Sequence, residues 1–114
     1  MSAARQTDPG MNVPRKVRVS PFSFDVLEVH GLADAGSCRP DVESVLLAMD
    51  QAPGQKRDTL LHESLHAIVR QGFGSTFEAV DKAFEEQVVS FFAPRILALL
   101  RDNPRLVAYL TERV

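Results

Sequence analysis

The sequence predicts an α+β fold in which a small N-terminal sheet is followed by two long helices. Two patterns support this class. Apolar and polar residues alternate near the N-terminus, as they do in half-buried strands, whereas the second half of the chain has helical periodicity. A chain of 114 residues, of which 45% are hydrophobic, can form one domain with a modest core.

Composition bears on the environment and the partners of the protein. Residues 1–14 are polar and aperiodic, which predicts a disordered tail before a domain over residues 15–114; translation could start at Met1 or Met11. The net charge of −2 gives no reason to expect nucleic acid or a membrane as partner. Cys38 is the only cysteine and no signal peptide is visible, so a reducing cytoplasm is expected.

Strand signals occupy the first half of the domain. Residues 16–19 and 22–26 alternate at period two, which predicts a hairpin or one strand interrupted at Ser20 and Pro21. Residues 31–40 are small and polar, so a loop is expected there. The apolar run 44–49 predicts a strand, and Pro53 and Gly54 predict a turn over residues 50–55.

A first helix is expected over residues 60–70. Asp58 or Thr59 can cap its N-terminus, and Gly72 and Gly74 are expected to end it. Its predicted buried stripe comprises the apolar side chains at one face, namely Leu60, Leu61, Leu65, Ile68 and Val69.

A second helix is expected to begin at residues 75–78, which have the Ser-x-x-Glu pattern of a capping box. It extends at least to Phe92, where Pro94 predicts a kink or a new helix start. The helix then resumes to Leu100, and Asn103 with Pro104 separates it from a last short turn over residues 106–110.

The chemically informative motif is His62-Glu63-Ser64-Leu65-His66, an H-E-x-x-H sequence inside the first predicted helix. Residues four apart lie one turn apart on the same helix face, so both imidazoles can reach one metal ion. Neutral imidazole is a good ligand for Zn²⁺. Glu63 projects beside that ion, where a carboxylate can accept a proton from metal-bound water.

A catalytic zinc site usually has three protein ligands, and four residues are candidates for the third. His30 and Cys38 are possible, but Glu85 and Glu86 on the second helix are better placed. Helical spacing groups Glu85 with charged residues on a solvent-exposed stripe. Glu86 falls among small residues, on a face that another helix can approach, so Glu86 is the favoured ligand.

Residues 59–68 resemble the core of minimal gluzincin-type metallopeptidase domains, which are common in bacteriophages and prophages. Those domains have a few strands, a polar loop and a short apolar strand before the H-E-x-x-H helix. They close with a helix that carries the acidic ligand. The resemblance covers about residues 15–110, and the residues that match the last helix are Glu86, Val89, Ser90, Phe92 and Ala93.

The resemblance implies a zincin-like hydrolase, specifically a zinc-dependent endopeptidase. His62, His66 and Glu86 would bind Zn²⁺, and Glu63 would be the general base. The substrate would be a protein or peptide, aligned by β-addition along the strand at residues 45–49. The compartment would be the cytoplasm, that of the host cell if a phage encodes the protein.

Two other functions are compatible with this sequence. One is a non-catalytic, zinc-stabilised protein-binding module of phage origin. The other is a helical interaction domain without metal, in which the H-E-x-x-H pattern arises by chance. Because a structural zinc site needs no base beside it, the presence of Glu63 favours the peptidase.

Overall fold

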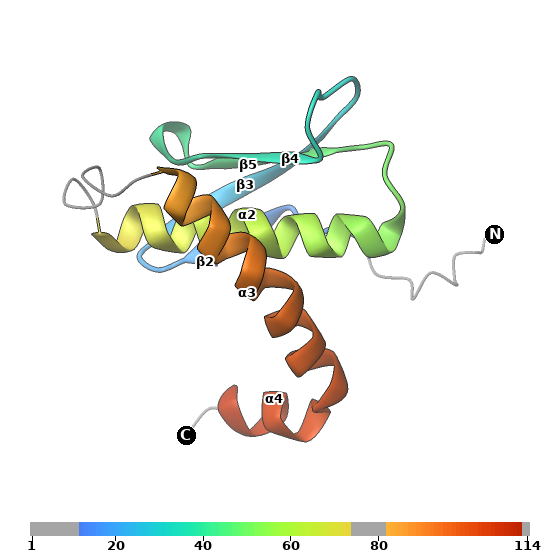
Figure 1. Cartoon of the computed structure of the whole chain (residues 1–114), viewed down its shortest axis with the longest axis vertical. Coiled ribbons are helices and arrows are strands. Elements are labelled where there is room, and N and C mark those ends of the chain that lie inside the picture. The colour runs from blue at the N-terminus through green and yellow to red at the C-terminus, as the bar shows by residue number, and fades with distance from the viewer. Residues whose placement is uncertain (1–11, 74–81, 113–114) are drawn as a thin grey trace.

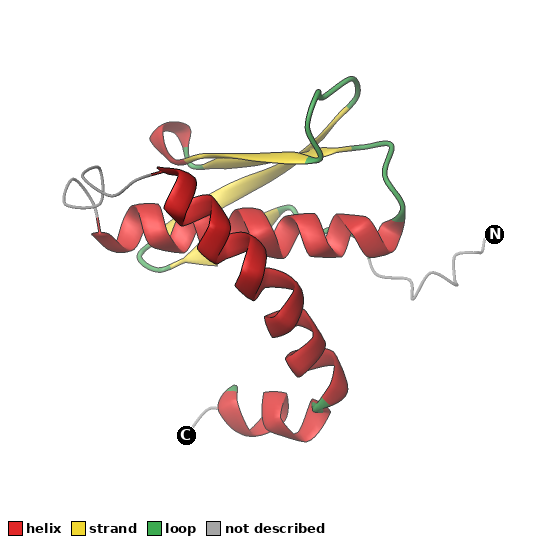
Figure 2. Cartoon of the chain, in the orientation of Figure 1, coloured by secondary structure: helices red, strands yellow, loops and turns green. Residues whose placement is uncertain are grey.

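The computed structural model describes residues 12–73 and 82–112, which form a four-stranded mixed sheet followed by helices. The prediction of an α+β fold with a small sheet before the helices is confirmed (Figures 1 and 2). The elements in chain order are β2 (Lys16–Val19), β3 (Phe22–Val29), β4 (Gly36–Arg39), the 3₁₀ helix η1 (Pro40–Val42), β5 (Ser44–Ala48), α2 (Pro53–Phe73), α3 (Lys82–Asp102) and α4 (Pro104–Leu110).

The strand order in the sheet is β2-β3-β5-β4. β2 and β3 form an antiparallel hairpin, in which Lys16 is opposite Asp25 and the Ser20–Pro21 peptide at the turn is cis. β5 pairs parallel with β3 and antiparallel with β4. The predicted strand at residues 44–49 is confirmed, and the first two strand segments form a hairpin rather than one interrupted strand.

The expectation of a loop throughout residues 31–40 was wrong, because Gly36–Arg39 form β4. The pairing of β4 with β5 places Cys38 opposite Val45 and Gly36 opposite Leu47. The ladder hydrogen bonds to β5 are made by backbone groups and therefore form whatever the side chains of β4 are. Small polar residues therefore form a strand here without an apolar alternation.

Helix α2 lies along one face of the sheet (Figure 1). The core between them contains Phe24, Val45 and Leu47, none of which is exposed to solvent, and Ala67 from the helix. The helix residues most deeply buried are Thr59, Glu63 and Ala67, which are spaced by four and therefore share one face. A carboxylate thus sits on the helix face that packs against the sheet.

The predicted boundaries of the first helix were too narrow. α2 begins at Pro53, because proline is well suited to the first turn of a helix, where its missing N–H is not needed. Asp58 and Thr59 therefore lie inside the helix and do not cap it, and residues 53–55 are not a turn. α2 continues to Phe73, so it does not end at Gly72, and Gly74 is outside the described residues.

The predicted buried stripe of this helix was also partly wrong. Ile68 is 52% exposed, and Leu61 and Leu65 are only half-buried. Leu60 packs against the core. Because α2 lies close to the sheet, the small side chains of Thr59 and Ala67 fit between them. The larger apolar side chains lie at the edge of this contact.

Helix α3 runs from Lys82 to Asp102 as one helix through Pro94, so no new helix start occurs there. The proposed capping box at residues 75–78 lies outside the described residues. The predicted break at Asn103 and Pro104 is confirmed: the Asn103 side-chain amide donates to the Leu99 carbonyl at 2.8 Å, and α4 begins at Pro104.

The N-terminal half of α3 packs on α2, and its C-terminal half leads away from the sheet toward α4 (Figure 1). Beyond Ala93 none of the described side chains of α3 or α4 is fully buried. Large apolar side chains are exposed along this part of the chain, among them Phe91, Phe92 and Leu99. None of the helices in the described residues combines the length and apolar character that a membrane span requires.

Candidate metal centre

His62 and His66 lie one turn apart on α2, with their ring centroids 4.9 Å apart. The Nε2 atoms of both rings face the carboxylate of Glu86 on α3. His62 Nε2 is 3.2 Å from Glu86 Oε2, and His66 Nε2 is 2.8 Å from Glu86 Oε1. One potential ligand atom from each of these three residues lies within 4.8 Å of the other two. The structure therefore brings together the three residues that the sequence predicts as metal ligands.

The donor set fits zinc. Two imidazole nitrogens and one carboxylate oxygen are donors that Zn²⁺ prefers, and three protein ligands leave one coordination position open in a catalytic site. Among the described residues the grouping includes neither His30 nor Cys38. His30 lies at the surface, with its Nδ1 3.5 Å from Asp50.

Glu85 was predicted to be a solvated charge, and this was wrong. It is only 3% exposed. Its Oε2 lies 2.5 Å from His66 Nδ1, and its Oε1 accepts a hydrogen bond from Arg70 Nε at 3.2 Å. Because an ionised carboxylate can only accept hydrogen bonds, this contact requires the proton of His66 on Nδ1. Nε2 lies 2.8 Å from Glu86 Oε1 and donates to that carboxylate, and a metal ion bound between the two would replace this proton.

The helix contains a signal that could have identified Glu85. Glu85, Val89 and Ala93 are spaced by four and are the buried residues of α3. The apolar side chains of Val89 and Ala93 mark the face that packs on α2, and Glu85 is one turn earlier on it. What the sequence does not reveal is that His66 and Arg70 supply the partners that make this buried carboxylate tolerable.

Glu86 lies on a face of α3 that approaches α2, as the sequence predicts, but its side chain remains 56% exposed. It is held by Ser90, whose hydroxyl donates to Glu86 Oε2 at 2.9 Å. Partial burial raises the pKa of Glu86, but hydrogen bonds from Ser90 and His66 and the charges of both histidines outweigh it, so that the pKa is lowered overall. Glu86 is therefore a carboxylate at neutral pH.

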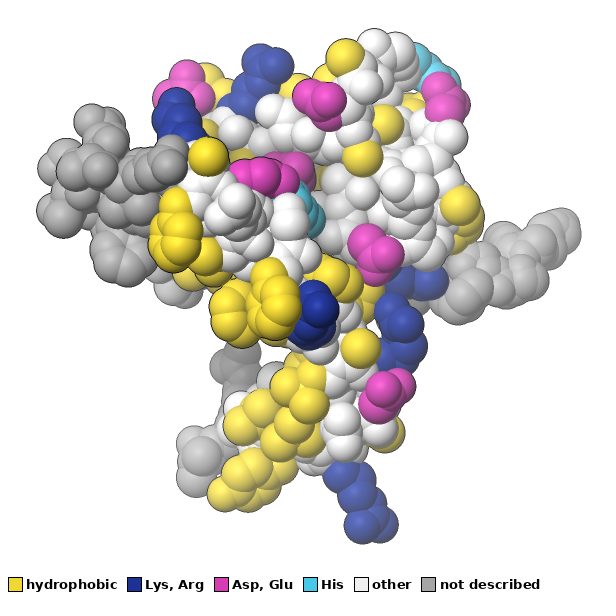
Figure 3. Space-filling view, in the orientation of Figure 1, with side chains coloured by type: hydrophobic (Ala, Val, Ile, Leu, Met, Phe, Trp, Pro, Cys, Tyr) yellow, Lys and Arg dark blue, Asp and Glu magenta, His cyan; other side chains and the backbone are white. Residues whose placement is uncertain are grey.

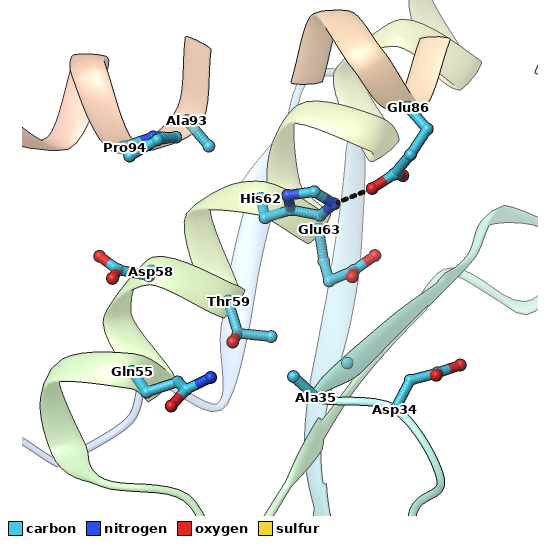
Figure 4. A pocket seen from close by; sticks show the side chains of 11 residues that line it. Asp34, Ala35, Gln55, Asp58, Thr59, His62, Glu63, Glu86, Ala93 and Pro94 are labelled. Carbon is cyan, nitrogen blue, oxygen red and sulfur yellow. Dashed lines mark ion pairs between the residues drawn. The ribbon is translucent and has the colours of Figure 1, made fainter. Parts of the chain in front are cut away.

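Glu63 lies beside this group, on the face of α2 that is turned toward the sheet (Figure 4). It is only 8% exposed, and none of the described residues donates a hydrogen bond to its carboxylate. Burial raises the pKa of Glu63. The charges of His62 and His66 oppose that shift, and those of Glu86 and Asp34 add to it. A carboxylate with a raised pKa is a stronger base than an exposed one.

A pocket of about 720 Å³ gives access to this group. It lies between α2, the segment that leads into β4, and the middle of α3 (Figure 4). His62, Glu63 and Glu86 line one part of it, and Ala93 and Pro94 close it from α3. Two of the candidate ligands, His62 and Glu86, therefore share one solvent-accessible pocket with the candidate base, whereas His66 lines the smaller pocket beside Cys38.

Gly36 determines how closely β4 approaches the site. A Cβ atom at this position would lie 2.5 Å from Thr59 Cγ2 and 3.2 Å from Glu63 Cγ. Both distances are too short for ordinary contact. Glycine at this position therefore lets the strand pack against the helix turn that carries Glu63.

Strand β4 is also the edge of the sheet. The Ala48 N–H donates to the Ala35 carbonyl at 2.8 Å, so the antiparallel alternation directs the backbone groups of Ser37 toward β5 and those of Gly36 and Cys38 away from it. The earlier expectation that residues 45–49 align a peptide was wrong, because β5 is paired on both sides. β4, like β2 at the other side of the sheet, pairs with only one strand of the described residues.

Cys38 lies on β4 beside His66 and Arg70, in a smaller pocket that Glu63 also lines. Burial, reinforced by the negative charge of Glu63, raises the pKa of the Cys38 thiol to about 11. A protonated thiol is a poor metal ligand. This agrees with the absence of Cys38 from the ligand group.

The chain matches no family model, and neither a curated protein nor a solved structure matches it significantly. The likeness to gluzincin-type domains thus rests on the motif itself. A function has to be inferred from the geometry and chemistry of the site.

Proposed function

We propose that the protein is a zinc-dependent metallopeptidase of the gluzincin type that acts as an endopeptidase. The observation that supports this most strongly is the convergence of His62 Nε2 and His66 Nε2 on the Glu86 carboxylate. Beside them lies Glu63, which has no hydrogen-bond donor among the described residues. Two imidazoles, a carboxylate ligand and a separate buried carboxylate are what zinc-assisted hydrolysis requires.

The residues have distinct roles in this proposal. His62, His66 and Glu86 hold the ion. Zn²⁺ bound there would polarise the substrate carbonyl and lower the pKa of a water molecule. Glu63 accepts the proton of that water and passes it to the leaving amine, a role that its burial and raised pKa support.

Glu85 and Arg70 act as positioning residues. Glu85 fixes the ring of His66 through Nδ1, and Arg70 balances the charge of Glu85. Such outer partners orient a ligand imidazole and increase its basicity. The buried position of Glu85 and its contacts with both His66 and Arg70 support this role.

An extended peptide fits along β4. The outward backbone groups of Gly36 and Cys38 can pair with a substrate strand. Gly36 lines the pocket that contains Glu63, so a peptide paired there passes the candidate base. Endopeptidase action is favoured because the pocket is open to solvent (Figure 3).

The proposal is tested with Glu63→Gln, which keeps the size of the side chain and removes the proton acceptor. We expect zinc-loaded wild-type protein to cleave an unstructured protein substrate, and the variant to retain its zinc and lose about 10² to 10⁴ in rate. Zinc content is measured on both proteins. Unchanged cleavage by the zinc-loaded variant would rule out this mechanism.

A zinc-stabilised protein-binding module is the alternative. The partial exposure of Glu86 and the small size of the domain favour it. If neither protein cleaves any member of a broad peptide library although both contain zinc, the module is the better account. Measuring zinc content and peptidase activity on the same protein therefore distinguishes the two functions.

A further inference from the structure

The pocket beside the candidate metal centre is lined by four carboxylates, and its described lining contains no Lys or Arg. Two of them, Glu63 and Glu86, belong to the site already described. The other two are Asp34, in the segment before β4, and Asp58, one turn before His62 on α2. Figure 3 shows acidic side chains around the hollow in which a histidine reaches the surface.

Asp34 and Asp58 stand on either side of Glu63 and Thr59 (Figure 4). Neither has an ion-pair partner among the described residues. Asp34 is close enough to Glu63 for its charge to affect that carboxylate. Two arginines of these helices have other partners: Arg70 pairs with Glu85, and Arg95 stacks on the Phe91 ring at 3.8 Å.

A second observation indicates that the pocket receives a ligand. Glu63 is 8% exposed, lacks a hydrogen-bond donor among the described residues and lines the pocket. A buried carboxylate without a partner is costly. Together with Asp34 and Asp58, it gives the pocket three carboxyl groups without a hydrogen-bond or ion-pair partner among the described residues.

We propose that this pocket selects peptide segments with a Lys or Arg side chain next to the bond to be cleaved, and that Asp34 and Asp58 are the residues that determine this preference. The proposal rests on the peptidase function proposed above and specifies its substrate class. A guanidinium or ammonium group placed between the pocket walls forms charge-assisted hydrogen bonds with an aspartate. Acidic segments are repelled by the same walls.

The test measures binding, so that it does not depend on cleavage. Short fluorescein-labelled alanine–glycine peptides with a central Arg, Ala or Glu are titrated into the full-length Glu63→Gln protein with zinc present, and anisotropy is recorded. We expect the Arg peptide to bind about tenfold more tightly than the Ala peptide, and the Glu peptide more weakly still. The preference should decrease with added salt.

Asp34→Asn and Asp58→Asn, singly and together, are compared with Asp102→Asn as control. Asp102 is exposed at the far end of α3, and its substitution changes the net charge equally. We expect the double variant to bind the Arg and Ala peptides alike, and Asp102→Asn to retain the preference. The exposed aspartates can be replaced without unfolding the protein, which circular dichroism verifies.

Equal binding of the three peptides, or no binding of any of them, would overturn the proposal. So would a preference for Arg that survives in the double variant, or a second zinc per chain that the double variant loses, because the pocket would then hold a metal ion instead. Failure of the peptidase function appears separately, as zinc-loaded wild-type protein that cleaves nothing. Where cleavage is observed, the fragments of a denatured protein should show Lys or Arg next to the cleaved bonds.

Discussion

His66 Nδ1 lies 2.5 Å from Glu85 Oε2, in a contact between α2 and α3 that is almost completely buried. This contact fixes the orientation of the imidazole ring, with Nε2 toward Glu86. Glu85 and Glu86 are adjacent in sequence, yet one meets Nδ1 of His66 and the other meets Nε2. The two carboxylates therefore differ in role, and their substitutions should differ in effect.

We expect Glu86→Gln to weaken zinc binding by orders of magnitude, because it removes a charged ligand, and Glu85→Gln to weaken it by about 10 to 100-fold, because it removes an outer partner of His66. A zinc competition titration measures both. Glu112→Gln, an exposed carboxylate after α4, serves as control and should have no effect. The reverse ranking, or wild-type affinity in Glu86→Gln, would show that Glu86 is not the third ligand.

Gly36→Ala tests the close approach of β4 to α2. The added methyl group would lie 2.5 Å from Thr59 Cγ2 and would also press on Glu63. We expect a loss of about 1–3 kcal/mol in the free energy of unfolding, as for other overpacked sites, measured by urea denaturation. Activity should fall further than stability explains.

Gly54→Ala provides the matched control. A Cβ atom at Gly54 meets nothing within 4 Å, and the residue lies in the first turn of α2. We expect this substitution to leave stability unchanged or to raise it by up to about 1 kcal/mol, because alanine restricts the unfolded chain. Equal destabilisation by both substitutions would contradict the packing of Gly36 described above.

The prediction for Glu63 concerns pH and the metal-free protein. Burial raises the pKa of Glu63 in the folded state. At pH values between the pKa of the unfolded state and that of the folded state, the folded protein therefore binds more protons than the unfolded chain. Its free energy of unfolding therefore falls as pH rises through that window. We expect Glu63→Gln to lack this loss, so that the variant gains stability relative to wild type between about pH 4 and pH 7.5.

Urea unfolding of both proteins at the two pH values measures this difference. Glu112→Gln controls for the loss of an exposed carboxylate. If wild type gains stability relative to Glu63→Gln as pH rises, Glu63 is a stabilised carboxylate with a partner, and its role as a free base would have to be abandoned.

The sequence predicts which strands and helices are present better than it predicts the residues at which they begin and end. Strand alternation identifies the β2–β3 hairpin and the apolar run identifies β5, because burial on the sheet imposes those patterns. β4 carries no such pattern, since its pairing with β5 depends on backbone groups that every residue has. Pro53 is equally common in turns and in the first turn of a helix, so only the packing of α2 on the sheet decides its conformation.

In the candidate site, too, local sequence predicts some features and the packing between elements decides the others. The spacing of His62 and His66 is local, and one helical turn suffices to bring them together. The assignment of Glu85 and Glu86 depends on how α3 is rotated against α2, and a shift of one residue turns a side chain by about 100°. The partners that explain a buried Glu85 lie on another helix. Local sequence identifies the pair of carboxylates, whereas the contact between helices decides which of them is buried.

The zinc content of the purified protein tests the central claim most directly. Protein expressed in zinc-replete medium and freed of loosely bound metal is analysed by elemental mass spectrometry, together with His62→Ala and His66→Ala. We expect about one zinc per chain in wild type, and little in either variant, together with lower thermal stability, because metal binding is coupled to folding. Wild-type protein that is folded and contains no zinc, or variants that retain one zinc per chain, would contradict a metal centre at His62, His66 and Glu86.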